Sequence, residues 1–517
     1  MMSAQSPFAT SDRPFQIFVW LAVLGAAACL ILLAIRSYFA ISFTEPMQVH
    51  TTGDEFSQFY AVWRQIQGLP VYTDRFSPPY YYAIYNWLFY YSYGFVTGIV
   101  LDLFSLKDAW VPTVARFISL AGMVVGIFAC YVSYLRACGS QTGRYKALSL
   151  AFAIFILAGP LVGYWNITVR SDLWARTLEI VGIALFIIYY PKDRWMAILW
   201  MILFGYLAWA FKQGSVFSVG AVGLFLLARR DWAPLFVFSS ILALAWGLTI
   251  YFGEPQYVYN FLLKDFPIIF SYDRMVRNLV NFSVKSGPVL FYLAALVFVI
   301  FSTRERLKLF WQNDNFVLGC GGIFCATVIA VPGSAQLGGA ENYFFSLSFF
   351  LGLMVCASLP ILAKLGEAVW TRTLAAGNIG WATLLVAIGL VLSGSTGVIN
   401  VRNQHTNYMA GKRCIDSLPR PLYVNNPYLS LPWMAPNTEP YVVSYNYLDD
   451  RNAGQAFKFG GIGGLISTGH FKVLAIQRGG KIPPKKIDGG HLKNYTLVHK
   501  KISAQNPCGK FFIFNRI

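Results

Sequence analysis

The feature that most constrains this chain is a series of continuous apolar runs, each about long enough to cross 30 Å of hydrocarbon. Lipid offers no partner to a free backbone N–H or C=O, so such runs cross as helices. They do not alternate with polar residues, which argues against a β-barrel. The sequence therefore predicts an all-α polytopic membrane protein with about 11 transmembrane helices. The candidate spans are 15–37, 113–135, 147–164, 173–190, 195–211, 214–228, 233–251, 287–302, 316–332, 344–363 and 378–396.

Topology depends on the run from Tyr80 to Phe104, which follows Ser77-Pro78-Pro79. The first span is too long for a cleaved signal and is interpreted as a signal anchor with the N-terminus inside. If residues 77–104 do not cross, the inner loops carry the basic clusters, as the positive-inside rule expects. We therefore interpret 77–104 as a partly embedded hairpin or interfacial helix. The basic residues concerned are Arg136, Arg144, Lys146, Lys192, Arg194, Arg229, Arg230, Arg304, Arg306, Lys308, Lys364 and Arg372.

This topology defines a membrane domain, 1–396, with long outer loops at 38–112 and 252–286, and an outer tail, 397–517. The tail contains short strand-like segments between turn signals, which predict a small α/β domain. These segments begin at Pro421, Pro440, Lys472 and Lys510. The tail carries 16 Lys and Arg against 5 Asp and Glu. Such a basic surface suits anionic headgroups or an acidic glycan, and a merely soluble surface is an equal alternative.

The eight cysteines fall into two groups. Six lie in or beside apolar spans without metal-ligand spacing, and we interpret them as packing residues. Cys414 and Cys508 lie in the tail. They could pair in a disulfide if the tail is outside the cytoplasm, although connectivity cannot be read from sequence.

Two adjacent carboxylates, Asp54 and Glu55, lie in the first outer loop. Aromatic and apolar residues from Phe56 to Ile66 recur at helical spacing, which predicts an amphipathic helix lying on the membrane. Neighbouring residues on a helix do not face each other, so the two carboxylates should have different roles. Thr52 and Glu55 fit a capping box, in which Glu55 stabilises the helix start. In that case Asp54 is the better candidate for a catalytic base or metal ligand.

Two further polar motifs lie at the ends of spans. Arg170-Ser-Asp172 opens the fourth span, where the charges either face an internal cavity or are a snorkelling Arg with a helix-capping Asp. Lys212-Gln213 ends the fifth span. Lys212 is either an interfacial anchor or a ligand of a lipid phosphate.

The later outer segments contain two more candidates. Arg274 and Arg277 are three residues apart and would share a helix face, as in a phosphate clamp. Asn342 and Tyr343 lie at an outer edge, where they either donate hydrogen bonds to a substrate or belong to the aromatic belt. The five histidines show no zinc-type spacing, and the chain has no Walker motif.

Together these motifs resemble the GT-C superfamily of polyprenyl-phosphate-sugar-dependent glycosyltransferases, in particular its bacterial aminoarabinose- and mannosyl-transferase-like branches. The resemblance covers most of the membrane region and depends on the order of the motifs. Arg170-Ser-Asp172 departs from the Arg-Pro-Asp of the family. The matching motifs are Gly53-Asp54-Glu55, Gly68-x-x-Val-Tyr72, Pro78-Pro79-Tyr, Arg170-Ser-Asp172, Lys212-Gln213 and Glu341-Asn-Tyr343-Phe.

The resemblance implies roles for individual residues. Asp54 would be the catalytic base, with Glu55 beside it. Lys212, Arg170, Arg274 and Arg277 would bind the donor phosphate. The remaining substrate-binding candidates are Asp172, Gln213, Asn342, Tyr343 and Tyr72.

The implied activity is inverting transfer of one sugar from a polyprenyl-phosphate donor to a glycan, lipid or protein acceptor. It would take place at the outer face of a bacterial inner membrane, with a cytoplasmic N-terminus and a periplasmic tail. Some family members use a divalent metal ion at the acidic pair, but two adjacent carboxylates are too few to argue for one here. The alternatives are a lipid or glycan transporter or flippase, a glycan ligase, and a membrane scaffold. Neither the sugar nor the acceptor can be read from the sequence.

Overall fold

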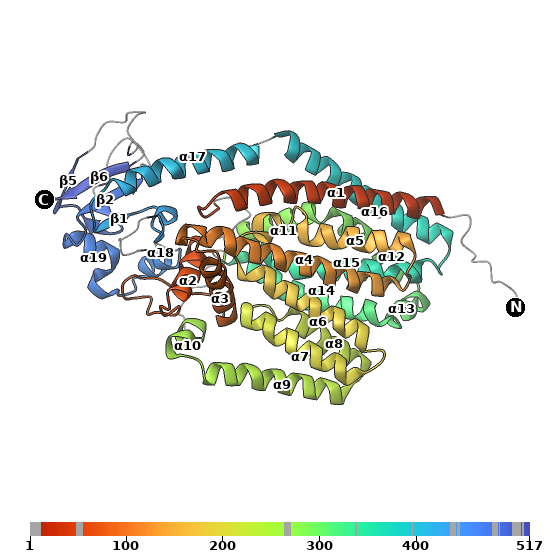
Figure 1. Ribbon diagram of the computed structural model, residues 1–517. Helices are drawn as coiled ribbons and strands as arrows, with labels where there is room; N and C mark the ends of the chain where they lie inside the picture. Colours follow the sequence, from red (N-terminus) through yellow and green to blue (C-terminus); the bar gives the residue numbers. More distant parts are fainter. Residues whose placement is uncertain are drawn as a thin grey trace.

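The computed structural model describes residues 12–47, 55–262, 270–336, 339–394, 396–434, 441, 445–477, 484, 486–498, 508 and 511–517. Each of the eleven predicted spans contains a helix, and the helices pack side by side in one bundle (Figure 1). The helices of the bundle are α1 (Asp12–Ser42), α4 (Val111–Cys138), α5 (Gly143–Ala158), α6 (Ser171–Tyr189), α7 (Arg194–Phe211), α8 (Phe217–Arg229), α9 (Trp232–Tyr251), α12 (Gly287–Phe301), α14 (Asp314–Ala335), α15 (Phe345–Leu362) and α16 (Glu367–Gly394).

Seven helices of the described chain are long and apolar enough to cross a membrane, namely α1, α4, α7, α9, α14, α15 and α16. An eighth span results if α11 (Tyr272–Lys285) and α12, which meet at an angle of 88°, are taken together. Helices α5 and α8 are shorter, with 16 and 13 residues, and α6 carries Asp172, Arg176 and Glu179. The chain is thus a multi-pass membrane protein, with fewer unambiguous spans than the sequence suggested.

The first outer loop folds into α2 (Phe56–Ile66) and α3 (Trp87–Leu103) at one end of the bundle (Figure 1). Helix α3 is not among the helices that are long and apolar enough to span, and the prediction that 77–104 is a partly embedded hairpin or interfacial helix stays a prediction. The prediction that α2 lies on the membrane is wrong, because Phe56, Phe59 and Tyr60 are buried in the protein. Two further short helices are α10 (Pro255–Leu262) and η3 (Glu341–Phe344).

Helix α17 (Thr396–Asp416) leads from the bundle to the C-terminal region, which forms a small α/β unit beyond α2 and α3 (Figure 1). Its sheet has the order β1-β2-β6-β5, with β1 and β2 parallel and the other pairs antiparallel. Three of the four predicted strands form, and the segment that begins at Pro440 lies, apart from Tyr441, outside the described residues. The elements are β1 (Leu422–Val424), α18 (Tyr445–Asn452), α19 (Gly461–Ser467), β2 (Val473–Gln477), β3 (Lys486–Ile487), β4 (Gly490–His491), β5 (Tyr495–Leu497) and β6 (Phe511–Arg516).

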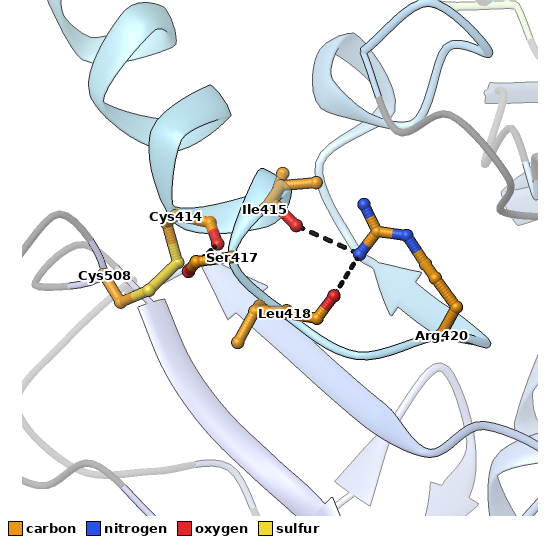
Figure 2. Close-up of a disulfide and its surroundings, with 6 residues drawn as sticks. All are labelled: Cys414, Ile415, Ser417, Leu418, Arg420 and Cys508. Carbon is orange, nitrogen blue, oxygen red and sulfur yellow. Dashed lines mark hydrogen bonds between the residues drawn. A yellow bond between two sulfur atoms is a disulfide. The ribbon is translucent and has the colours of Figure 1, made fainter.

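Cys414 and Cys508 form a disulfide, which is the pairing that the sequence left open. Figure 2 shows how it fastens the end of α17 close to the start of β6. The Arg420 guanidinium donates to the carbonyls of Ile415 and Leu418, at 3.0 and 2.7 Å, and so closes the turn after α17. These contacts set the direction in which α17 enters the C-terminal unit.

The C-terminal unit is also attached to the first outer loop. Arg75 and Asp450 form a buried ion pair at 3.4 Å. The Tyr80 hydroxyl donates to the Lys458 carbonyl at 2.7 Å, and the Tyr80 ring packs among C-terminal aromatic rings such as that of Tyr447. The two regions therefore share a buried interface at the end of the bundle.

Candidate functional site

The first candidate carboxylate, Asp54, lies outside the described residues, and its neighbour Glu55 is completely buried. The Glu55 carboxylate accepts backbone N–H bonds from Met47 at 2.8 Å and from Val169 at 3.0 Å. It also accepts two bonds from Arg116, Nε to Oε1 at 3.0 Å and Nη2 to Oε2 at 2.7 Å. This carboxylate therefore joins the first outer loop to α4 and to the segment before α6.

The capping-box prediction for Glu55 is wrong. Helix α2 begins at Phe56 with Glu55 itself in the N-cap position, and its side chain makes no capping bond. Thr52 lies outside the described residues. A buried carboxylate next to a buried guanidinium is better satisfied by the bidentate pair with Arg116 than by a backbone N–H.

The Glu55 carboxylate does not fit the role of a metal ligand. Its two oxygens offer about four lone-pair directions, and the four donors described above use them. One of these donors, Arg116, is itself a cation and would repel a metal ion. Within the described residues no group of three or more His, Cys, Asp or Glu side chains is placed to hold a metal.

The second carboxylate, Asp172, is the centre of a cluster that draws on three helix ends. Asp172 lies in the first turn of α6 and forms an ion pair with Lys212, at the C-cap of α7. Asn342 in η3 donates to Asp172 Oδ1 at 2.7 Å. Arg170 is the N-cap residue of α6, and its Nε lies 3.8 Å from Asp172 Oδ2. The idea that Asp172 caps its helix is wrong, because its carboxylate faces these side chains.

Aromatic rings orient the Arg170 guanidinium. It donates through Nη2 to the Tyr85 hydroxyl at 2.5 Å. Its carbon Cζ lies 4.6 Å from the centre of the Trp165 ring and 5.3 Å from that of Tyr85. A planar guanidinium stacks well on such faces, so the rings fix its direction without neutralising its charge.

Tyr343 packs beside Lys212, whose Nζ is 5.5 Å from the centre of the Tyr343 ring. The other neighbour of this ring is Gly333 in α14, where an added Cβ would lie only 2.4 Å from ring carbons. Glycine is therefore needed at 333 for Tyr343 to take this place.

The Lys212 ammonium stays charged at neutral pH. Burial lowers the pKa of Lys212 and the Asp172 carboxylate raises it, and the carboxylate outweighs burial, so the pKa lies above its ordinary value. Arg170 and Lys212 are both ion-paired with Asp172. The cluster thus brings two cations together in a largely buried place, where they can stabilise an anion.

Two oxygens of the cluster, Asp172 Oδ2 and Asn342 Oδ1, have no hydrogen-bond partner within the described residues. Buried polar atoms in native proteins are nearly always satisfied, so water or a bound hydroxyl-bearing molecule is expected here. The arrangement can therefore bind a molecule that is both anionic and rich in hydroxyl groups.

Two other candidates, Gln213 and Tyr72, form hydrogen bonds to the chain segment that carries Tyr85. Gln213 donates through Nε2 to the Ile84 carbonyl at 2.8 Å, and the Tyr72 hydroxyl donates to the Tyr85 carbonyl at 2.9 Å. The first bond ties the 84–85 segment to the end of α7, and the second ties it to the loop that follows α2. Tyr72 therefore acts on the cluster through Tyr85 rather than facing it.

The structure does not join Arg274 or Arg277 directly to the Asp172 cluster. Arg274 donates to the Gln336 carbonyl at 3.1 Å, and Arg277 is exposed on α11. Helix α11 is connected to the cluster indirectly, because Lys285 forms an ion pair with Glu341, the residue before Asn342. The two arginines do lie on one helix, α11.

Sequence reasoning missed Arg116, Tyr85 and Trp165. Arg116 carried a usable signal, since an ionisable residue inside a predicted span marks an internal site. Tyr85 and Trp165 carried none, because they lie among many aromatic residues of the same kind. Only their contact with Arg170 distinguishes them.

Neither a protein-family model nor a curated protein sequence matches the chain. Among solved structures, it is similar to ArnT from Cupriavidus metallidurans bound to undecaprenyl phosphate, with TM-score 0.53, 12% identity, and coverage of 95% of this chain and 97% of that chain. For the apo state of the same ArnT the TM-score is 0.53 at 14% identity, with coverage of 88% and 92%. The Archaeoglobus fulgidus oligosaccharyltransferase in its apo form gives 0.43 at 13% identity, covering 80% of this chain and 59% of that chain.

The similarity to ArnT extends over nearly the full length of both chains and concerns the fold. This chain therefore shares the fold of ArnT, in line with the resemblance stated from the sequence.

Proposed function

We propose that this chain is a membrane glycosyltransferase that moves a single sugar from a polyprenyl-phosphate donor to an envelope glycan, lipid or protein acceptor. The observation that carries the proposal is the Asp172 cluster, in which two cations face one carboxylate and nearby oxygens lack partners. A sugar phosphate supplies both an anion and hydroxyl groups. The similar ArnT structure is bound to undecaprenyl phosphate, which supports a lipid phosphate as the donor group.

In the proposed reaction the acceptor hydroxyl attacks the anomeric carbon of the donor sugar. The bond from that carbon to the phosphate oxygen breaks, and its electron pair stays on the phosphate. Asp54 takes the hydroxyl proton, a contribution of about 10²–10⁴-fold. Lys212 and Arg170 stabilise the charge that develops on the phosphate. A single displacement of this kind inverts the anomeric centre.

Asp54 is preferred to Glu55 as the base because the Glu55 carboxylate is already filled by four donors. Proton transfer needs a free oxygen within hydrogen-bond reach of the acceptor. Arg274 and Arg277 are proposed as further donor contacts, since α11 lies at an outer end of α12.

For its location we propose a bacterial inner membrane, with the C-terminal unit in the periplasm. The Cys414–Cys508 disulfide supports this side, because disulfides persist in oxidising compartments.

The test is to incubate the purified full-length protein with polyprenyl-phosphate sugars and to measure the release of polyprenyl phosphate. The wild type should release it, and Asp54→Asn should be slower by about 10²-fold or more. Asp273→Asn is the matched control, because it makes the same change at an exposed residue of α11. An Asp54→Asn variant as active as the wild type would remove Asp54 as the base.

A transporter is the second candidate, because α6 carries two buried ionisable residues deeper in the bundle. Arg176 donates to the Ile156 carbonyl and to Ser348 Oγ, both at 3.2 Å. Glu179 accepts from Ser218 N at 3.1 Å and from Ser346 Oγ at 2.9 Å. Transporters use such groups at membrane depth. If the protein moves lipid between the leaflets of vesicles without consuming donor, it is a transporter. If it consumes only diphosphate-linked glycans, it is a ligase.

A further inference from the structure

Helix α11 exposes a stripe of apolar side chains along its whole length. The stripe consists of Tyr272, Val276, Val280 and Val284, whose exposed fractions are 73, 38, 55 and 64%. These residues follow one another at intervals of four and therefore share one face of the helix. A helix at a water-exposed surface has the opposite arrangement, with its apolar stripe turned toward the core.

The opposite face of α11 is attached to the protein. Asn278 is buried, and its amide donates to the carbonyls of Ser334 at 2.9 Å and of Gly339 at 3.4 Å. Phe282 is also buried and stacks on Phe344 of η3, with ring centres 4.8 Å apart. Because this face is already occupied, the apolar stripe is the side of α11 that is left for a partner outside the chain.

The direction of α11 suits a membrane surface. Helix α12 packs against the spanning helix α16, and α11 meets α12 at 88°. Helix α11 therefore runs across the bundle rather than along it. Only Ser286 separates the two helices, so α11 lies at the level where the chain enters the bilayer as α12. A helix in this place lies in the plane of the headgroups.

The basic residues of α11 lie along one border of the stripe. At about 100° per residue, Arg274, Arg277 and Lys285 all fall on the same flank of the helix. Asp273 is in the first turn, where a carboxylate complements the helix dipole. An apolar face bordered by cations is the pattern of a helix that lies on a bilayer, with its cations at the level of the lipid phosphates.

We propose that α11 is an interfacial helix that binds the lipid surface on the side of the Asp172 cluster. Its apolar stripe lies among the acyl chains, and its cationic flank meets the phosphates of anionic lipids. The lipid contact does not depend on the proposed function. It bears on the cluster, because Lys285 forms an ion pair with Glu341, and the adjacent Asn342 donates to Asp172 at 2.7 Å. Lipid bound to α11 therefore helps to hold η3 on the cluster.

Photo-crosslinking tests the lipid contact. The full-length protein is reconstituted in liposomes of phosphatidylcholine and phosphatidylglycerol, with p-benzoyl-phenylalanine in place of Val280. Irradiation should attach phospholipid at this position about as efficiently as at Phe298, an exposed residue of α12. The attached lipid should contain more phosphatidylglycerol than the liposomes do. The same replacement of Arg413, an exposed residue of α17, is the matched control and should capture no lipid.

Three outcomes of this experiment would contradict the proposal. A crosslink between two copies of the chain would make the stripe an interface between protomers. A position 280 that captures as little lipid as position 413 would mean that the stripe faces water. Capture of the two lipids in proportion to their amounts would remove the role of the cationic flank.

Hydrogen–deuterium exchange in the same liposomes tests the consequence for the cluster. Val280→Asp places a charge in the stripe and weakens the lipid contact, so peptides that contain Glu341–Phe344 should exchange about tenfold faster than in the wild type. Asn281→Asp adds the same carboxylate beside the cationic flank and should exchange as the wild type does. Equal exchange in the two variants would overturn the link between lipid and η3. If the wild type releases no polyprenyl phosphate, the proposed function fails, and both measurements on α11 remain decisive.

Discussion

The carboxylates of Glu55 and Asp172 are both buried and both paired with basic side chains, yet their surroundings differ. Glu55 has its lone pairs filled by Arg116 and two backbone N–H groups. Asp172 has one oxygen bound by Lys212 and Asn342, while its second oxygen has no hydrogen bond within the described residues.

This difference separates a structural ion pair from a binding site. A saturated pair is costly to disturb and has nothing left to offer a ligand. A partly satisfied cluster that brings two cations together keeps both donors and acceptors for a ligand. The acidic pair that drew attention in the sequence therefore contains one structural residue, Glu55, and one proposed base, Asp54.

The largest expected effect comes from breaking the saturated pair. Arg116→Ala leaves the buried Glu55 charge unpaired and should destabilise the fold by about 3–5 kcal/mol. Thermal unfolding of the detergent-purified protein would show this as a clear drop in Tm. The double variant Glu55→Leu with Arg116→Met should unfold at a higher temperature than Arg116→Ala. Equal Tm values for Arg116→Ala and the wild type would contradict a structural role for the pair.

The next largest effect concerns the open cluster. Lys212→Ala should lower the rate of polyprenyl-phosphate release by about 10²–10³-fold, because it removes a cation that stabilises the leaving phosphate. Its Tm should change much less than that of Arg116→Ala. Lys192→Ala, at an exposed residue of another helix connection, is the control. If Lys212→Ala fails to fold, the Asp172 cluster is structural in the same way as the Glu55 pair. That result would contradict the distinction between a structural ion pair and a binding site.

A smaller effect is expected from Asn342→Ala. It removes the 2.7 Å hydrogen bond to Asp172, and bonds to charged groups contribute about 1.5–3 kcal/mol. The value of kcat/KM for donor should fall by at least about tenfold. Steady-state kinetics at several donor concentrations would measure it. A value equal to that of the wild type would show that Asn342 only packs against the cluster.

The smallest effect is expected from Tyr85→Phe, which keeps the ring beside Arg170 and removes the hydroxyl that accepts its bond. A net loss of about 1 kcal/mol corresponds to a fall of about fivefold in kcat/KM. Tyr91→Phe, at a partly buried tyrosine of α3, controls for the loss of a hydroxyl. A drop as large as that of Lys212→Ala would mean that Tyr85 itself contacts substrate.

The sequence singled out Arg170, Asp172, Lys212, Asn342 and Tyr343 in three separate motifs, and the structure brings them into one cluster. Each motif occurs at the end of an apolar run, and the ends of packed helices can meet. The prediction failed for α2, because an amphipathic pattern cannot distinguish a membrane surface from a protein surface.

The sequence by itself determined the bundle of helices and the position of the polar motifs at their ends, because hydrocarbon length and backbone hydrogen bonding allow few alternatives. Only the tertiary structure decided which carboxylate is saturated and which is open. That outcome depends on Arg116 from α4 and on Lys212 from the end of α7, which reach the Glu55 and Asp172 carboxylates only after folding. Their contacts form only when segments distant in sequence pack together in three dimensions. A local pattern of residues does not predict such contacts.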